Sequence, residues 1–253
     1  MLKKILLKIW FFYSSVIFFS CMFIFLPLSA FALVFGEKLG RYLSCFFLKS
    51  WGFLFSLLIG IIYRVKNKEE TNTNLPAVFI SNHRSFLDTP AAFMAINTRF
   101  MPLGKVEMKK VPFFGWFYPK VVVVINRNSF ESRKKSMLEM RKKLIEGTSI
   151  FIFPEGSMNR TEKHLTDFYE GAFQLAIDAQ VSIIPIIISN TAKILPPYKT
   201  NVFPGIVNIE VLEAISTINL KREDIDEIKS KTFKMMLEVL ENNQKEIKEK
   251  ILI

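Results

Sequence analysis

The sequence predicts an α/β protein in which a mixed, largely parallel sheet is flanked by helices, with two apolar helices in front of it. After residue 69, short apolar runs alternate with amphipathic stretches, a pattern typical of a sheet covered by helices on both faces. Before residue 69 the chain is strongly apolar, and 12 of its 26 phenylalanines lie between Phe11 and Phe55. A length of 253 residues suits one such domain with an appendage.

The same two parts of the chain, before and after residue 69, also differ in net charge. Residues 1–68 carry nine Lys and Arg side chains against one acidic residue, Glu37, so most of the net charge of +11 lies there. The remainder is nearly balanced, which disfavours a nucleic-acid-binding protein. Only two cysteines, Cys21 and Cys45, are present, which excludes a disulfide-stapled domain and a zinc site built on Cys pairs.

The first apolar stretch, residues 10–36, holds 27 residues without a charge. As a helix it is long enough to cross a hydrocarbon core of about 30 Å. Pro27 divides it, and a second apolar stretch runs from Tyr42 to Tyr63 with Lys49 inside it. We therefore predict two apolar helices that join near Gly36–Gly40.

The two apolar stretches indicate a membrane-embedded hairpin over residues 1–68. The α/β domain is predicted to follow over residues 69–253. Cations flank both ends of the hairpin, which by the positive-inside rule places both ends, and the active site, on the cytoplasmic face. A hairpin that spans the bilayer and one inserted into a single leaflet both fit this pattern. Lys49 and Pro27 favour shallow insertion, because a charge at the bilayer centre is costly.

Five apolar runs in the second part predict strands, at Ala77–Ile80, Val121–Ile125, Ser149–Phe153, Ser182–Ile188 and Val207–Leu212. Helical patterns lie at Ser132–Ile145 and Ala172–Ala179. The tail, Asp224–Ile251, has apolar residues at near-helical spacing and predicts an amphipathic helix packed on the domain.

The most suggestive chemistry follows the strand VFIS, in the stretch SNHRSFLDTP. A strand-to-helix turn would expose His83 and Asp88 at the carboxyl end of the sheet, where α/β active sites usually lie. An imidazole beside a carboxylate can take a proton from a hydroxyl. Ser85 has the wrong spacing for a nucleophile elbow and is more simply a helix cap. The other histidine, His164, stands in a polar loop without a partner at useful spacing.

Two further strings also carry candidate residues. Lys105 lies in GKVEMKKVPFFGWF and Arg127 ends the strand that follows it, so the two side chains could grip an anion. In FIFPEGSMNR, Glu155 could bind a hydroxyl or hold the loop, and backbone amides around Gly156 would be free. Each string is equally well explained as a turn after a strand.

Taken together, these strings resemble a known family. His-x4-Asp in NHRSFLD, the Lys105–Arg127 block, FPEG at 153–156 and VSIIPIII at 181–188 are similar to four ordered motifs of the lysophospholipid acyltransferases related to glycerol-3-phosphate acyltransferase. In length and N-terminal layout the chain is most similar to the 1-acylglycerol-3-phosphate acyltransferases. The resemblance covers roughly residues 76–215.

The resemblance implies a glycerol-3-phosphate acyltransferase-like fold and transfer of a fatty acyl group to the free hydroxyl of lysophosphatidate, giving phosphatidic acid for phospholipid synthesis. The donor would be acyl-CoA or acyl carrier protein, acting as a co-substrate. No cofactor and no metal are implied. The expected partners are membrane phospholipids, lysophosphatidate and the acyl donor, and not nucleic acid.

The resemblance also assigns roles to residues. It implies that His83 is the general base and Asp88 its orienting partner. Lys105 and Arg127 would bind the acceptor phosphate. The remaining expected site residues are those that shape the acceptor site, Glu155 and Gly156. Amides of the loop around Gly156 and of the helix that starts after His83 are candidates for binding the oxyanion.

One departure from the family pattern affects the acceptor. Where the family usually has Glu-Gly-Thr-Arg, this chain has Met158 in place of the arginine, and Arg160 lies two positions further on. Arg160 could substitute, and a lysophospholipid with a different headgroup remains an alternative substrate. A second alternative is a non-catalytic module that binds the membrane surface through its basic N-terminal segment.

Overall fold

The computed structural model describes residues 2–36, 39–198 and 201–252. Seven strands form its central sheet: β1 (Ile61–Lys66), β2 (Val78–Ser81), β3 (Phe100–Lys105), β4 (Val123–Ile125), β5 (Ser149–Ile152), β6 (Ile183–Ser189) and β7 (Gly205–Val211). Their order is β1-β7-β6-β2-β5-β3-β4, and all neighbours run parallel except β6 and β7. The mixed, largely parallel sheet that the sequence predicts is therefore present.

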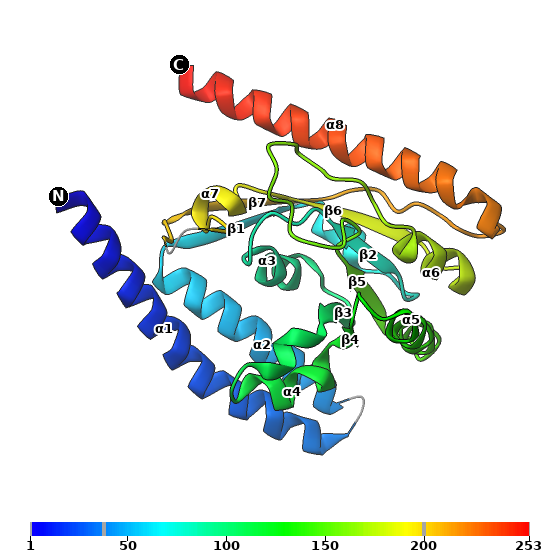
Figure 1. The fold of residues 1–253 in the computed structure, drawn as a ribbon, viewed down its shortest axis with the longest axis horizontal. Helices are drawn as coiled ribbons and strands as arrows, with labels where there is room; N and C mark the ends of the chain where they lie inside the picture. The colour runs from blue at the N-terminus through cyan, green and yellow to red at the C-terminus, as the bar shows by residue number, and fades with distance from the viewer. Residues whose placement is uncertain (1, 37–38, 199–200, 253) are drawn as a thin grey trace.

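Helices cover both faces of this sheet (Figure 1). They are α1 (Leu2–Ala32), α2 (Leu39–Leu58), α3 (Asp88–Ala95), α4 (Phe114–Val121), α5 (Phe130–Ile145), α6 (Gly171–Ala179), α7 (Thr191–Ile194) and α8 (Ile225–Leu252). Short 3₁₀ turns lie at η1 (Leu33–Phe35), η2 (Lys68–Thr71), η3 (Val106–Lys110) and η4 (Arg222–Asp224). Helices α5, α6 and α8 share one apolar core with the sheet, and α3 shares a second core with its other face.

The three central strands, β6, β2 and β5, are buried along almost their whole length. Successive residues of β2 enter opposite cores, Val78 and Ile80 on the α5–α6–α8 side and Phe79 on the α3 side. Strands buried on both faces need apolar residues at every position, which is why these segments are continuous apolar runs. The five strands expected from such runs all appear, with ends shifted by at most two residues.

The two predicted helices of the globular part and the tail helix are present as α5, α6 and α8. Met236 and Leu240 of α8 are buried against the core that α6 shares, so this helix packs on the domain as expected. The side chains of Ile247 and Ile251, which the tail pattern includes, lie outside the described residues.

The prediction of a helix from Tyr42 to Tyr63 is wrong at its end. Helix α2 stops at Leu58, and residues 61–66 form the edge strand β1, which pairs in parallel with β7. Gly60, with φ +71°, turns the chain between the two. Although it lies within the first 68 residues, β1 is thus part of the sheet. Val121 likewise ends α4 and does not begin a strand.

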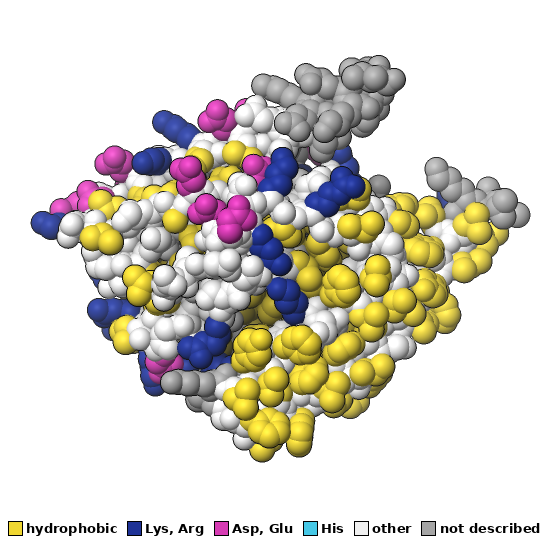
Figure 2. Space-filling model, turned by 180° about the vertical axis from the view of Figure 1, so that it is seen from behind, with side chains coloured by type: hydrophobic (Ala, Val, Ile, Leu, Met, Phe, Trp, Pro, Cys, Tyr) yellow, Lys and Arg dark blue, Asp and Glu magenta, His cyan; other side chains and the backbone are white. Residues whose placement is uncertain are grey.

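The first apolar stretch forms a single helix that Pro27 does not divide. Over the described residues, one helix, Lys4–Phe35, is long and apolar enough to cross a membrane by length and composition. Helix α1 packs on α2 and also on the domain, where Met22 and Leu26 contact Phe117 of α4. Its other side leaves large apolar side chains exposed, and Figure 2 shows a broad apolar face bordered by Lys and Arg. The expected connection at Gly36–Gly40 includes residues 37 and 38, outside the described residues.

Between η3 and α4 the chain makes a strained turn at an exposed aromatic residue. Phe113 has φ +63° and ψ −45°, and the Phe114 amide donates to the Pro112 carbonyl at 2.7 Å. This is a γ-turn with positive φ, which costs about 1–3 kcal/mol in a residue with a side chain. Beside it, Gly115 lies so close to Lys109 that a Cβ would be 2.0 Å from the Lys109 carbonyl oxygen.

We expect Gly115→Ala to lower the free energy of unfolding by about 1–3 kcal/mol, because the added methyl overlaps backbone that cannot move independently. Gly171→Ala is the matched control, since a Cβ there meets nothing within 4 Å. That control should leave stability unchanged or slightly raised. Urea unfolding of both variants measures the difference, and equal effects would contradict the close packing at Gly115.

Candidate active site

The carboxyl ends of four neighbouring parallel strands bring the expected site residues to one edge of the sheet. Asn82 and His83 follow β2, and Glu155 follows β5. Lys105 ends β3, and Arg127 comes two residues after β4. Because β2, β5, β3 and β4 are adjacent and parallel, these residues form a row along one edge.

His83 and Asp88 are in direct contact. His83 Nδ1 lies 2.9 Å from Asp88 Oδ2, and the same oxygen accepts the backbone amides of Arg84 and Ser85 at 2.6 and 2.7 Å. Asp88 is fully buried, whereas the His83 side chain keeps 17% of its surface exposed. The turn thus shields the carboxylate and leaves the imidazole accessible from solvent.

This contact fixes the form of the imidazole. A carboxylate only accepts hydrogen bonds, so in the neutral ring Nδ1 carries the hydrogen that points to Asp88 and Nε2 has the free lone pair. The ring also stacks on Phe153, with centroids 3.9 Å apart and planes 12° from parallel. Asp88 and Phe153 together hold the ring in one orientation.

Glu155 holds the loop that runs from Pro154 to Thr166. The sequence leaves two roles open for this residue, binding a hydroxyl or holding the loop, and the contacts agree with the second. Its Oε1 accepts the backbone amide of His83 at 2.8 Å, and Oε2 accepts the amide and hydroxyl of Thr166 at 2.8 and 2.7 Å. The residue is 3% exposed. Burial raises the pKa of the Glu155 carboxyl, and the hydrogen bonds from Thr166 and His83 oppose that rise.

The loop that follows Glu155 is fastened back onto the turn at His83. The Asn159 amide donates to the His83 carbonyl at 2.6 Å, and the Arg84 guanidinium donates to the carbonyls of Thr161 and Lys163. On the other side, the buried side chain of Asn82 exchanges two hydrogen bonds with the backbone of Ile188 in β6. Three segments far apart in sequence therefore meet around His83.

Three of the backbone amides near His83 and Gly156 already have acceptors within the protein. The Gly156 amide donates to the Phe153 carbonyl at 3.0 Å, and the Arg84 and Ser85 amides donate to Asp88. Among the described residues, none accepts a hydrogen bond from the Ser157 or Met158 amide. Those two amides, next along the same loop, remain able to bind a developing negative charge.

Tyr169 adjoins Gly156 and also influences the charge of Arg127. Gly156 has φ +69°, and a Cβ there would be 2.6 Å from the Tyr169 ring. Arg127 is half-buried, and burial lowers the pKa of its guanidinium while Glu107, Tyr118 and Tyr169 oppose that change. Tyr169 therefore packs beside Gly156, and its charge interaction with Arg127 opposes the effect of burial on the guanidinium.

The other two cations are exposed. The Arg160 guanidinium lies 4.6 Å from the centre of the Tyr198 ring, a cation–π contact. Lys105 stands at the end of β3, paired in register with Ile125 of β4. In the described part of the chain, no hydrogen bond joins Lys105, Arg127 or Arg160 to His83.

Several residues at the site were not expected from the sequence. Asn82 stands directly before His83, and Phe153 opens the FPEG string, so their positions beside motif residues were the available signals. Thr166 lies eleven residues beyond Glu155 in a polar loop and gives no such signal. Ser85 is buried and its hydroxyl donates to the Leu195 carbonyl, which agrees with a structural role.

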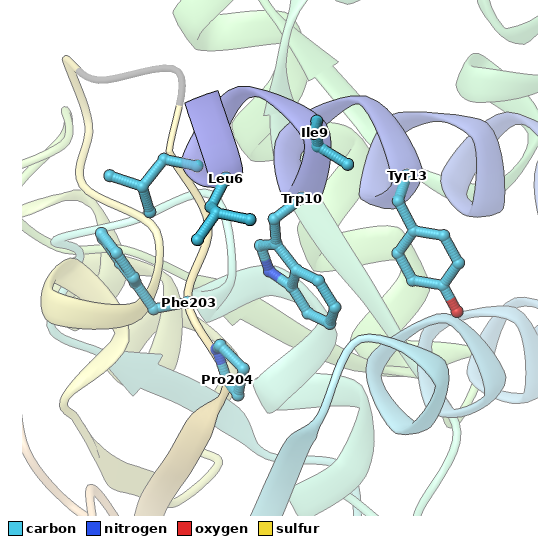
Figure 3. Close-up of a pocket in the computed structure, with 7 residues that line it drawn as sticks. Leu6, Ile9, Trp10, Tyr13, Phe203 and Pro204 are labelled. Carbon is cyan, nitrogen blue, oxygen red and sulfur yellow. The ribbon is translucent and has the colours of Figure 1, made fainter. Parts of the chain in front are cut away.

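An apolar hollow of about 500 Å³ lies at the same edge of the sheet (Figure 3). It is lined by Leu6, Leu7, Ile9, Trp10 and Tyr13 of α1 and by Phe203 and Pro204. Pro204 directly precedes β7, which starts at this edge because it runs antiparallel to β6. A surface of this composition suits a hydrocarbon chain.

Comparisons with known proteins all identify acyltransferases. The family model named Acyltransferase matches residues 62–189. A 1-acyl-sn-glycerol-3-phosphate acyltransferase of Saccharomyces cerevisiae is 31% identical over 198 residues, covering 73% of this chain and 61% of the yeast protein. An uncharacterized acyltransferase of Schizosaccharomyces pombe is 32% identical, covering 77% and 70%.

A human relative, 1-acyl-sn-glycerol-3-phosphate acyltransferase beta, is 30% identical, covering 68% of this chain and 62% of its own. The match therefore spans about three fifths of the yeast and human enzymes. Among solved structures, the 1-acyl-sn-glycerophosphate (LPA) acyltransferase PlsC from Thermotoga maritima superposes with a TM-score of 0.76 over 96% of this chain and 97% of that one. At 18% identity this likeness establishes the fold.

We expect Glu155→Gln to lower the free energy of unfolding by about 1–3 kcal/mol, measured by urea unfolding at neutral pH. The glutamine NH₂ would face either the His83 amide or the Thr166 amide, leaving two donors opposed in a buried site. Thr166→Val is the control, because it removes one hydroxyl bond and leaves both amide bonds to Glu155 in place. A loss no larger for Glu155→Gln than for Thr166→Val would contradict the bridging role.

Proposed function

Because this chain belongs to the acyltransferase family, we propose that it transfers a fatty acyl group from acyl-CoA or acyl carrier protein to the free hydroxyl of 1-acylglycerol-3-phosphate. The product would be phosphatidic acid. The observation that carries the proposal is the 2.9 Å contact between His83 Nδ1 and buried Asp88, which leaves Nε2 available as a base at the carboxyl edge of the sheet. The names of the yeast and human relatives support the substrate.

In the proposed reaction His83 acts as general base and no covalent enzyme intermediate forms. Nε2 takes the proton of the acceptor hydroxyl as its oxygen attacks the thioester carbonyl, forming the new ester bond. When the tetrahedral intermediate collapses, the C–S bond breaks and the imidazolium gives the proton to the leaving thiolate, which departs as the thiol. Asp88 stabilises the imidazolium through Nδ1, so the charge that develops on the ring is matched by a buried carboxylate.

Two negative charges need binding partners in this reaction: the oxyanion of the transition state and the phosphate of the acceptor. The amides of Ser157 and Met158 are proposed to donate to the oxyanion. Arg127, Lys105 and Arg160 are proposed to bind the acceptor phosphate, for which arginine is a favoured donor. Lys105 and Arg127 lie at the same edge of the sheet as His83, and Arg160 lies in the loop that follows Glu155. Glu155 and Gly156 shape this region by holding the loop against the turn.

Attachment to the membrane is part of the proposal. Helix α1 exposes Phe12, Phe23 and Phe31 on one side, while its other side contacts the domain from Trp10 to Leu26. A helix pressed along its length onto a folded domain is poorly placed to cross a bilayer alone, which favours insertion into one leaflet. The apolar hollow beside α1 would then receive a lipid chain close to the site, on the cytoplasmic face.

A second candidate function is transfer to a lysophospholipid with another headgroup. Met158 supports it, because an apolar side chain replaces a cation expected to bind phosphate. A mass-spectrometric product assay separates the two candidates when purified protein receives a panel of lysophospholipids with both donors. Turnover of lysophosphatidylglycerol without turnover of lysophosphatidate would overturn the primary substrate.

We expect His83→Ala to reduce acyl transfer at least about a hundredfold, because general-base catalysis typically contributes that much or more. Circular dichroism and sedimentation with vesicles should remain as in the parent protein. His164→Ala, which removes the only other histidine, should retain activity. Full activity in His83→Ala would disprove the general base, and an inactive parent would favour a non-catalytic membrane module.

We expect Met158→Arg to raise kcat/KM for lysophosphatidate relative to lysophosphatidylglycerol by about tenfold, since a charge-assisted hydrogen bond to phosphate contributes about 1.5–3 kcal/mol. Met158→Leu is the matched control and should leave the ratio unchanged. An unaltered ratio in Met158→Arg would show that Arg160 or Arg127 already supplies this contact.

A further inference from the structure

The segment between β3 and β4 presents large apolar side chains that the proposed chemistry does not use. It comprises η3 and α4, residues 106–121, and is called here the η3–α4 segment. Phe113 and Trp116 are 73% and 65% exposed, and Met108 and Val111 are exposed beside them. Exposed aromatic residues gathered on one short segment usually mark a contact surface.

The fold holds this segment rigidly while turning its tip outward. Phe117 is fully buried against Met22 and Leu26 of α1, and Gly115 lies tightly against Lys109. Between these fixed points, the γ-turn at Phe113 directs an aromatic ring away from the core at the cost of backbone strain. Strain of this kind persists only where the surrounding contacts impose it.

The exposed tip continues the apolar side of α1. The rings of Phe113 and Phe23 lie 6.1 Å apart in an edge-to-face arrangement, and Phe23 is itself among the exposed residues of α1. In Figure 1, α4 lies beside the C-terminal part of α1 and the start of α2. One apolar surface therefore spans the helix pair and the η3–α4 segment.

Charge on the segment matches an anionic surface. Three exposed lysines, Lys109, Lys110 and Lys120, stand against one acidic residue, Glu107. The Lys120 ammonium lies 3.9 Å from the centre of the Trp116 ring, so a cation sits directly beside an exposed indole. Tryptophan with neighbouring lysines is the composition found at the level of lipid headgroups.

We propose that the η3–α4 segment is a second membrane-contacting element, with Phe113 and Trp116 entering the leaflet that α1 contacts and the lysines binding anionic phospholipid headgroups. The inference rests on the proposed membrane attachment of α1 and extends it to a separate part of the chain. It places the end of β3, and with it Lys105, next to the headgroup layer from which a lysophospholipid would enter.

The test uses Trp116 as a reporter in the full chain. Trp10→Phe combined with Trp51→Phe leaves Trp116 as the single tryptophan. The protein is bound to vesicles of phosphatidylcholine and phosphatidylglycerol that carry bromine at defined depths of the acyl chain. We expect acyl-chain bromine to quench Trp116 and the aqueous quencher acrylamide to lose access to it on binding.

Three results would overturn the proposal. If the protein sediments with vesicles while Trp116 remains open to acrylamide and unquenched by bromine, α1 attaches and the η3–α4 segment does not. If Trp116 is shielded from both quenchers, another protein surface covers it. If the protein does not sediment with vesicles at all, the attachment through α1 fails as well.

Matched aspartate variants locate the contact. Phe113→Asp should reduce quenching of Trp116 by acyl-chain bromine by about twofold or more, because a carboxylate resists entering hydrocarbon. Aspartate tolerates positive φ better than phenylalanine, so the turn should persist. Phe130→Asp is the control, since Phe130 is 72% exposed on α5, and it should leave quenching unchanged. Equal effects of both changes would contradict the proposal.

Discussion

The site depends on one buried oxygen atom, Asp88 Oδ2. It accepts hydrogen bonds from the imidazole of His83 and from the amides of Arg84 and Ser85, all within 2.9 Å. Separating any donor would leave a buried charge under-satisfied, which is strongly unfavourable. The carboxylate also stands in the first turn of α3, where the helix dipole favours a negative charge. The same interaction therefore closes the turn after β2 and sets which imidazole nitrogen can accept a proton.

Glu155 complements Asp88 from the neighbouring strand. Asp88 orients the imidazole, whereas Glu155 holds the backbone of His83 and bridges it to Thr166. Because β2 and β5 are adjacent and parallel, Glu155 after β5 reaches the turn after β2 that Asp88 binds from the start of α3. The loop after Glu155 is consequently fixed at both ends, and amides that lie within it keep a defined position relative to His83. Two acidic residues thus hold the backbone and the imidazole of His83, and neither of them occupies Nε2.

The sequence predicts the buried strands well because burial on both faces demands unbroken apolar runs, as in β2, β5 and β6. It misses β1 because IIYRVK directly follows an apolar helix, and β3 because Pro102 and Gly104 interrupt it. The contact of His83 with Asp88 joins residues five apart in the sequence, so it could be predicted from their spacing. The contact of Asn82 with Ile188 depends on tertiary structure, and that of Glu155 with Thr166 depends on the path of the loop between them. The bonds from the Arg84 and Ser85 amides to Asp88 are local, but residue types alone do not show which acceptor a backbone amide will find.

Phe113 raises the free energy of the folded protein in two separate ways. Its positive φ costs about 1–3 kcal/mol, and its ring leaves apolar surface in water. Glycine would avoid both costs and would form the same turn. The surrounding contacts of Gly115 and Phe117 impose the turn, but they do not explain an aromatic side chain at its tip. Burial of that ring in lipid beside Phe23 would offset the exposed area, and the strain would then hold the ring outward before any membrane is reached.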